Sequence, residues 1–215
     1  MTGKLSTNKR DFDKEAESWD ENPFRRQLGE SLGKVIAGAV PLKSSDFVLD
    51  YGAGTGLISL ALCDRVKCVL AADSSRGMLN ALAAKTKAVG ISNIQPVFLD
   101  LEEDGASVPA VDVIVSSMTL HHVREIPRLA GIFFSMLRAG GRIALADLST
   151  EAGDFHSDNT GVHHFGFDAD WLSAVFTAAG FSDAHTAVAH TVRKQVASGE
   201  AKEFSVLLLT AVKPQ

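Results

Sequence analysis

One stretch of this chain decides its fold: Phe47-Val48-Leu49-Asp50-Tyr51-Gly52-Ala53-Gly54-Thr55-Gly56. Its apolar residues predict a short buried strand, which ends at an acid and runs into a glycine-rich turn. An apolar helical pattern begins directly afterwards, at Leu57. An open α/β sheet builds its nucleotide site from a strand, a glycine turn and a helix in this order. The glycines allow a tight turn and the close approach of a ligand.

The spacing of the glycines favours one class of nucleotide. A dinucleotide-binding fingerprint reads G-x-G-x-x-G, and Leu57 stands where its third glycine would be. The chain instead has Gly52, Gly54 and Gly56, with Asp50 two residues before the first of them. This pattern resembles the first motif of class I S-adenosylmethionine (SAM) dependent methyltransferases. Taken alone, it is equally consistent with a tight strand-to-helix turn.

The composition is that of a globular protein. Its 215 residues suit one α/β domain, and 46% of them are apolar and 22% charged. The formal net charge is −5 without any basic block, which disfavours a nucleic-acid partner. Residues 1–10 are polar and predict a disordered tail, and the strand-sized apolar runs predict no membrane span. Cys63 and Cys68 predict free thiols and a cytoplasmic protein.

Apolar runs and helical periods alternate along the chain. We expect helices over 12–19, 24–40, 57–65, 75–89, 123–138 and 168–179, and strands over 46–51, 68–73, 94–99, 111–116, 142–148, 184–192 and 204–212. This alternation predicts a Rossmann-like, doubly wound α/β fold with a parallel sheet. The last two strands should form a hairpin joined by residues 194–202. Asn22 should cap the second helix, with Pro23 in its first turn. Residues 149–167 lack an apolar period and predict a binding loop.

Two acids at strand ends are candidates for nucleotide recognition. Asp73 ends the second strand, where a carboxylate can accept hydrogen bonds from both hydroxyls of a ribose. Its alternative role is to cap the next helix. Asp100 ends the third strand and can accept from an adenine amine while Leu101 packs on the ring; a solvated acid is the alternative. Met78 would face the same pocket or pack in the core.

From about Phe12 to Lys213 the order of motifs resembles that of class I methyltransferases. The likeness is strongest to the small-molecule branch that includes ubiquinone and menaquinone biosynthesis methyltransferases. The motifs that carry it, besides the glycine turn, are Asp73-Ser74-Ser75 with Met78-Leu79, Asp100-Leu101, Leu120-His121-His122-Val123, Leu137-Arg138-Ala139-Gly140-Gly141 and Ala179-Gly180-Phe181. The chain departs from the family at Tyr51, where an aliphatic residue is usual. It also lacks the Asn/Asp-Pro-Pro-Tyr/Phe signature after strand four, which argues against methylation of adenine bases or glutamine.

The resemblance implies a fold and a set of cofactor contacts. The fold is a seven-stranded sheet in the order 3-2-1-4-5-7-6 with strand 7 antiparallel, in one domain over 11–215 with a helical lid at about 11–40. Trp19 and Phe24 would belong to this lid, or form a hydrophobic staple. The implied SAM contacts are Asp50, Gly52, Gly54, Gly56, Asp73, Ser74, Met78, Asp100, Leu101 and Ser116.

Histidines are the candidates for a catalytic base, because their pKa lies near neutral pH. His121 and His122 follow strand four, beside the expected position of the methyl group. His163 and His164 lie in the long loop that should fold over the same face. A packing or surface role is the alternative for each of them. No metal is predicted, because the loop histidines and acids lack a ligand spacing that fixes a coordination geometry.

The sequence therefore predicts a cytoplasmic transferase that moves a methyl group from SAM to a small-molecule acceptor. Three alternatives remain: a non-catalytic SAM-binding protein, a methyltransferase with a protein or RNA acceptor, and a nicotinamide-dependent oxidoreductase. Leu57 and Asp50 speak against the last of these. The oligomeric state and the accepting atom do not follow from the sequence.

Overall fold

The computed structural model describes residues 10–101 and 108–215. The strands are β1 (Phe47–Tyr51), β2 (Cys68–Asp73), β3 (Ile94–Phe98), β4 (Val111–Ser117), β5 (Leu137–Leu148), β6 (Ser182–Gln195) and β7 (Ala201–Val212). The α-helices are α1 (Phe12–Glu15), α2 (Pro23–Ala39), α3 (Leu57–Leu62), α4 (Arg76–Ala88), α5 (Ile126–Met136) and α6 (Ala169–Ala178). Short 3-10 helices are η1 (Ala16–Glu21), η2 (Cys63–Arg65) and η3 (Leu120–His122). Except for Arg10, the predicted disordered tail at 1–10 lies outside the described residues.

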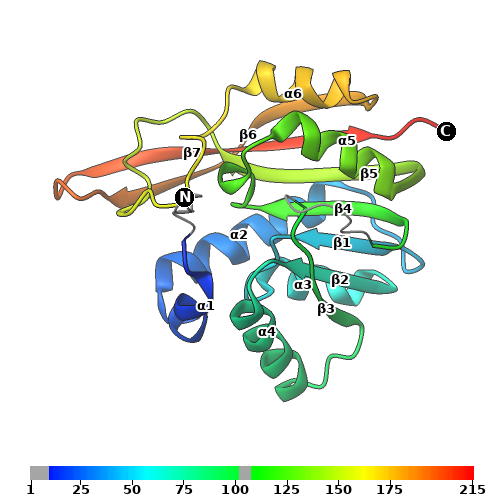
Figure 1. Ribbon diagram of the computed structural model, residues 1–215, viewed down its shortest axis with the longest axis horizontal. Coiled ribbons are helices and arrows are strands. Elements are labelled where there is room, and N and C mark those ends of the chain that lie inside the picture. The colour runs from blue at the N-terminus through cyan, green and yellow to red at the C-terminus, as the bar shows by residue number, and fades with distance from the viewer. Residues whose placement is uncertain (1–9, 102–107) are drawn as a thin grey trace, which may run out of the picture.

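The seven strands form one sheet in the order β3-β2-β1-β4-β5-β7-β6 (Figure 1). β1 to β5 pair in parallel, whereas β7 runs antiparallel to both β5 and β6. The predicted sheet order and the antiparallel strand 7 are confirmed. Because β1 and β4 lie at the centre and the chain crosses over between them, their carboxyl ends meet at the switch point where such sheets bind ligands.

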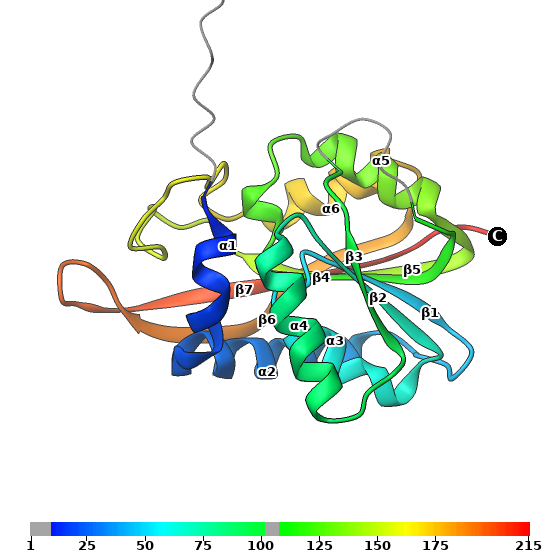
Figure 2. The ribbon, with the colours of Figure 1, turned by 60° about the horizontal axis from the view of Figure 1, so that its bottom comes forward.

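Helices cover both faces of the sheet (Figure 2). One buried cluster joins α5 and α6 to residues such as Leu49, and the other joins α2, α3 and Leu82 of α4 to residues such as Val48. Adjacent residues of β1 thus belong to opposite faces, as the two-residue period of a strand requires. None of the helices in the described ranges is long and apolar enough to cross a bilayer.

Polar caps place the helices that surround the site. The Asn22 side chain accepts from the N–H groups of Phe24 and Arg25, and Pro23 occupies the first turn of α2, as predicted. Ser75 caps α4 by accepting from the N–H of Met78. These caps set where each helix begins at the carboxyl edge of the sheet.

Predicted boundaries are wrong in three parts of the chain. The helix expected over 12–19 changes after α1 into the 3-10 helix η1. The helix expected over 123–138 is shorter at both ends: Pro127 fits only the first turn of α5, and β5 begins at Leu137 rather than at residue 142. The closing hairpin is longer than predicted, and its turn comprises only residues 196–200. In Figure 1 this hairpin reaches well beyond the other strands.

Candidate functional site

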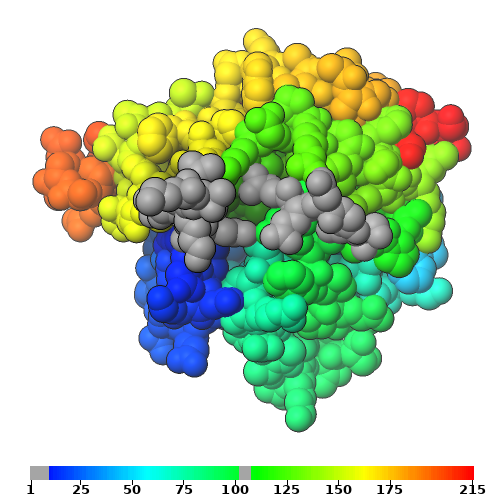
Figure 3. Space-filling view, viewed as in Figure 1, coloured from blue at the N-terminus to red at the C-terminus, as the bar shows by residue number. Residues whose placement is uncertain are grey.

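A cavity of about 970 Å³ lies at the carboxyl ends of the parallel strands. The glycine turn, the ends of β2 and β4 and the 3-10 helix η3 form its floor. Three further segments wall it: residues 10–29, the loop over 149–167 and the end of β6. Figure 3 shows the first two of these segments side by side on one face of the molecule. A Cβ added at Gly161 would lie 3.4 Å from Cβ of Arg10.

The glycine turn presents bare backbone to this cavity. Gly54 has a φ of +54°, and a Cβ added there would meet none of the surrounding described residues within 4 Å. At Gly52, with a φ of +71°, an added Cβ would collide with the side chain of Thr119. Gly52 therefore permits close packing against η3, whereas Gly54 leaves open space for a ligand.

Asp73 connects the glycine turn to the start of α4. Its Oδ2 accepts from the N–H of Gly54 and its Oδ1 accepts from the N–H of Ser75, both at 2.8 Å. Burial raises the pKa of this carboxyl, although both hydrogen bonds favour its charged form. Its capping contact and its place in the cavity wall coexist, so the two roles considered from the sequence do not exclude each other.

The predicted cofactor residues divide into two groups. Those that line the cavity are Gly52, Gly54, Asp73, Ser74, Met78 and Asp100. Those outside its lining are Asp50, Gly56, Leu101 and Ser116. The second group lies behind the wall: Asp50 and Ser116 are in buried strands, Gly56 precedes α3, and Leu101 is in the core.

Asp50 illustrates this supporting position. Its side chain is fully buried, its Oδ2 accepts from the hydroxyl of Ser59 at 2.6 Å, and burial raises its pKa to about 7. The Ser116 hydroxyl donates to the backbone oxygen of Tyr51 at 2.7 Å and so joins β4 to β1. Gly56 packs against Leu82, and Leu101 lies in the core.

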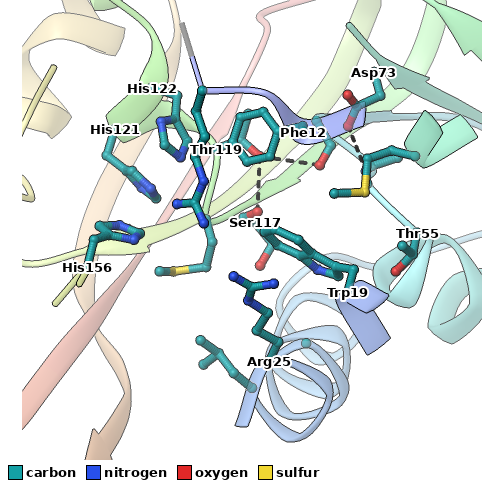
Figure 4. Close-up of a pocket in the computed structure, with 18 of the residues that line it drawn as sticks. Phe12, Trp19, Arg25, Thr55, Asp73, Ser117, Thr119, His121, His122 and His156 are labelled. Atoms are coloured by element: carbon teal, nitrogen blue, oxygen red, sulfur yellow. Dashed lines mark hydrogen bonds between the residues drawn. The ribbon is translucent and has the colours of Figure 1, made fainter. Parts of the chain in front are cut away.

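The segment over 12–21, hereafter the strap, closes one side of the cavity. Oδ1 of Asp13 accepts from the Ser75 hydroxyl at 2.6 Å and from the N–H of Gly77 at 2.8 Å. Asp20 accepts from the Thr55 hydroxyl and pairs with Lys85, both at 2.7 Å. These contacts fasten the strap to α4 and to the glycine turn, and Phe12 and Trp19 then face the cavity (Figure 4).

His121 forms a buried pair with Asp147 at the opposite side of the cavity. Its Nδ1 lies 2.7 Å from Oδ1 of Asp147, and both side chains are 1% exposed. Because a carboxylate only accepts, Nδ1 of His121 carries a hydrogen and donates it to Asp147. Burial opposes ionisation of Asp147, but His121 and backbone N–H groups outweigh it and lower its pKa. Nε2 of His121 has no hydrogen-bond partner among the described residues.

Two more histidines surround His121 (Figure 4). The ring of His122 lies 4.3 Å from that of His121, and its Nδ1–H donates to the carbonyl of Gly161 at 2.7 Å. The ring of His156 lies 4.9 Å from that of His121. Burial, reinforced by neighbouring His121, lowers the pKa of His122 to about 4 and that of His156 to about 3. Both rings are therefore neutral at physiological pH.

The two remaining candidates lie farther out. His163 is exposed at the cavity rim, and its Nε2 accepts from Arg124 at 3.4 Å. His164 is outside the cavity lining, and its Nε2–H donates to the carbonyl of Val123 at 2.9 Å. Within residues 10–101 and 108–215, no group of side chains is suited to hold a metal ion.

The sequence did not predict several residues in the cavity lining or directly behind it. Asp147 was overlooked, although an acid in the apolar run before residue 149 must find a buried partner. The other omissions, His156, Arg25 and Lys194, had no local signal, since only the packing of distant segments brings them to the cavity.

The segments that form the floor of the cavity lie in a part of the chain that matches a known protein family. Residues 48–141 match the family model of a methyltransferase domain. These residues form a methyltransferase domain. The chain is 28% identical over 157 residues to an uncharacterized methyltransferase of Schizosaccharomyces pombe. This alignment covers 66% of the chain and 55% of the relative. It is also 28% identical over 141 residues to a demethylmenaquinone methyltransferase of Clavibacter sepedonicus, covering 65% and 57%.

The fold around the methyltransferase domain also has solved counterparts. One is phosphoethanolamine N-methyltransferase 2 of Haemonchus contortus, in complex with phosphomonomethylethanolamine and S-adenosylhomocysteine (SAH). It superposes with a TM-score of 0.71 at 13% identity, covering 94% of this chain and 58% of that one. The chain spans little more than half the length of the curated relatives it matches.

Proposed function

We propose that this protein is a SAM-dependent methyltransferase that methylates a small-molecule acceptor. The observation that carries the proposal is one cavity with a fixed carboxylate, Asp73, on one side and the His121–Asp147 pair on the other (Figure 4). Asp73 is placed to accept from a ribose diol, and Asp100 from the adenine. Gly54 leaves the backbone open to the methionine end, and Gly52 lets the turn pack closely against Thr119.

The size and the cover of the cavity support a small acceptor. Binding pockets for ligands of drug size span roughly 300–1,000 Å³. At about 970 Å³, this cavity has room for a cofactor and a second small molecule. The name of the Clavibacter relative, a demethylmenaquinone methyltransferase, points in the same direction. A protein or RNA acceptor would need a surface that the strap and the 149–167 loop leave accessible.

In this proposal the protein positions the acceptor and removes its proton. The sulfonium of bound SAM supplies an already activated methyl group. Asp147 holds the Nδ1–H of His121, which leaves Nε2 to accept the proton of an acceptor hydroxyl or acidic carbon. His156 lies beside the ring of His121 and Nε2 of His121 is buried, so the His156 side chain must move aside to bring the acceptor to Nε2. The walls exclude water once the cavity is filled.

We further propose one domain over 11–215 in which the first helices, at about 11–40, act as a lid. The contacts of Asp13 and Asp20 support this role for the strap. A cytoplasmic location also stays a proposal, supported by two buried free thiols, Cys63 and Cys68.

Calorimetric titration tests the cofactor. SAM and SAH should bind with micromolar or tighter affinity, whereas NADH and NADPH should give no heat of binding. Micromolar binding of NADH without binding of either SAM compound would replace the proposal with the oxidoreductase alternative. Binding of SAH without release of SAH in any metabolite screen would favour the non-catalytic alternative.

Single substitutions test the base once an acceptor is found. His121→Ala should lower turnover by roughly 10²-fold or more, the scale of a lost general base. Its SAH affinity should stay within about threefold, under ~1 kcal/mol. The matched changes His122→Ala, His163→Ala and His164→Ala should have smaller effects, and circular dichroism checks that each variant folds. Near-normal turnover in all four variants would show that the acceptor needs no histidine base.

A further inference from the structure

The charged residues of the cavity are divided between its two ends. Its lining acids, Asp73 and Asp100, follow β2 and β3 at one edge of the sheet. Its lining cations are Arg10, Arg25, Arg124, Arg193 and Lys194. Two of these cations come from the end of β6, the strand at the opposite edge. The end of the cavity away from the proposed nucleoside site is therefore positively charged.

Lys194 is a partly buried cation in this end. Its ammonium group lies 4.8 Å from the ring centre of Phe155 and 5.5 Å from that of Phe24, and it donates to the carbonyl of Phe155. It forms no ion pair with any of the described residues within 4.0 Å. Burial, with Arg25 and Arg10 nearby, lowers its pKa. An anion beside Lys194 would relieve this repulsion.

Two carboxylates, those of Glu15 and Glu151, lie close to these cations. Arg10 and Arg25 share the single carboxylate of Glu15, at 2.6 and 3.1 Å. Glu151, which also acts on Lys194, uses its Oε2 to accept from three backbone N–H groups of its own loop. Three cations therefore face this end with one shared carboxylate and with Glu151, whose buried Oε1 has no hydrogen-bond partner among the described residues.

Aromatic rings cover the space between the cations. Phe24 and Phe155 lie 6.2 Å apart under Lys194, and the Arg25 guanidinium stacks 3.9 Å over the ring of Trp19. Figure 4 shows Arg25 beside Trp19, with Asp73 and the three histidines on opposite sides of the cavity. A ligand here would meet an apolar surface with a positive charge at its end.

We propose that the methyl acceptor is an amphipathic anion, with an apolar body against Phe24 and Phe155 and a carboxylate or phosphate group at Lys194. This inference rests on the proposed function only in taking the ligand to be the acceptor. Arg25 adds positive charge from the strap side. A carboxylate and a phosphate both satisfy this chemistry, and binding experiments separate them.

Matched probes test the inference on protein saturated with SAH. The probes are 2-naphthoate, 2-naphthyl phosphate and the neutral amide 2-naphthamide, which has the shape of the carboxylate without its charge. Calorimetry should show that at least one anion binds tenfold or more tightly than the amide, or ~1.4 kcal/mol. The stronger of the two anions identifies the acidic group. Weaker binding of both anions than of the amide, or no binding of any probe at millimolar concentration, would overturn the inference.

Lys194→Met removes the charge and keeps the length of the side chain. It should reduce the preference for the anion to less than threefold and leave SAH affinity within threefold. Lys202→Met is the matched control, because Lys202 pairs with Lys194 in the β6–β7 register but forms an ion pair with Asp154 outside the cavity lining. It should keep the full preference. A tenfold loss of SAH affinity in Lys194→Met would assign this lysine to the cofactor and overturn the inference. Failure of the unmodified protein to bind SAH would instead count against the proposed function.

Discussion

The carboxylate of Asp73 lies at the junction of the glycine turn, α4 and the cavity. Both of its oxygens accept from backbone N–H groups, and both retain lone pairs for a ligand. Its removal therefore has two separable effects, one on the stability of the turn and one on cofactor binding.

Asp73→Ala should weaken SAH binding roughly tenfold to a thousandfold, because charge-assisted hydrogen bonds contribute roughly 1.5–3 kcal/mol each and are not additive. It should also lower the melting temperature, since the N–H groups of Gly54 and Ser75 lose their acceptor. Asp46→Ala is the control: it removes a carboxylate that accepts from the N–H of Lys43 outside the cavity lining, and it should lower stability by about 1 kcal/mol with SAH affinity unchanged. Equal SAH affinities in Asp73→Ala and the unmodified protein, measured by calorimetry, would limit Asp73 to the structural role.

His156 makes stability depend on pH. Its pKa is about 3 in the folded protein and 6.5 in the unfolded chain, so the unfolded state binds more protons below pH 6.5. Its stabilising contribution is complete above pH 6.5 and is lost as the pH falls toward 3. At pH 5 the free energy of unfolding would fall by about 2 kcal/mol if the His156 ring were fully buried, and by about 1 kcal/mol for a half-buried ring that solvent screens.

His156→Gln should therefore lose less stability than the unmodified protein between pH 7 and pH 5. The difference in the fall of the melting temperature should be about 2–4 °C for a chain of this length. His185→Gln, on the exposed part of β6, is the matched control and should follow the unmodified protein. An equal fall in melting temperature between pH 7 and pH 5 for His156→Gln and the unmodified protein would contradict the buried, neutral state of His156.

At the scale of elements, the strap is held to the cofactor side of the cavity by a few polar contacts. Asp20 bridges η1 to both the glycine turn and α4. We expect Asp20→Ala to speed amide hydrogen exchange over 12–21 and to raise the dissociation rate of SAH about tenfold, as expected for losing ~1–2 kcal/mol of hydrogen bonds and a half-exposed ion pair. Glu17→Ala, an exposed change on the same 3-10 helix, should alter neither rate. An unchanged dissociation rate in Asp20→Ala would show that the strap does not gate the cofactor.

The elements that could be predicted are those with local signals. Asn22 and Pro23 fix the start of α2, and the ends of β1 and β2 follow from an acid or a glycine after an apolar run. The extent of the last hairpin had no such signal, because pairing across the sheet rather than local composition extends β6 to Gln195. The strand order was predicted by resemblance and not by periodicity.

Over the whole molecule, the two sides of the cavity differ in how far their residues could be predicted. The glycine turn and Asp73 come from one continuous strand–turn–helix–strand segment, so a sequence motif reveals them. The histidine side combines β5, η3 and the long loop, and the cationic end combines the start of α2 with the end of β6. Such side chains meet only through long-range packing, and this is why His156 and Lys194 escaped prediction.

The matched methyltransferase domain ends at residue 141, before the long loop and the final hairpin begin. The cavity therefore has two parts. The segment that matches the family model forms most of its floor, and segments from the two ends of the chain form its walls. Under the proposed function, substitutions in residues 149–167 and 193–195 would alter which molecule is methylated and leave the residues proposed to hold the methyl donor unchanged. An engineer seeking a new substrate would therefore diversify residues 149–167 and 193–195, and leave residues 47–101 unchanged.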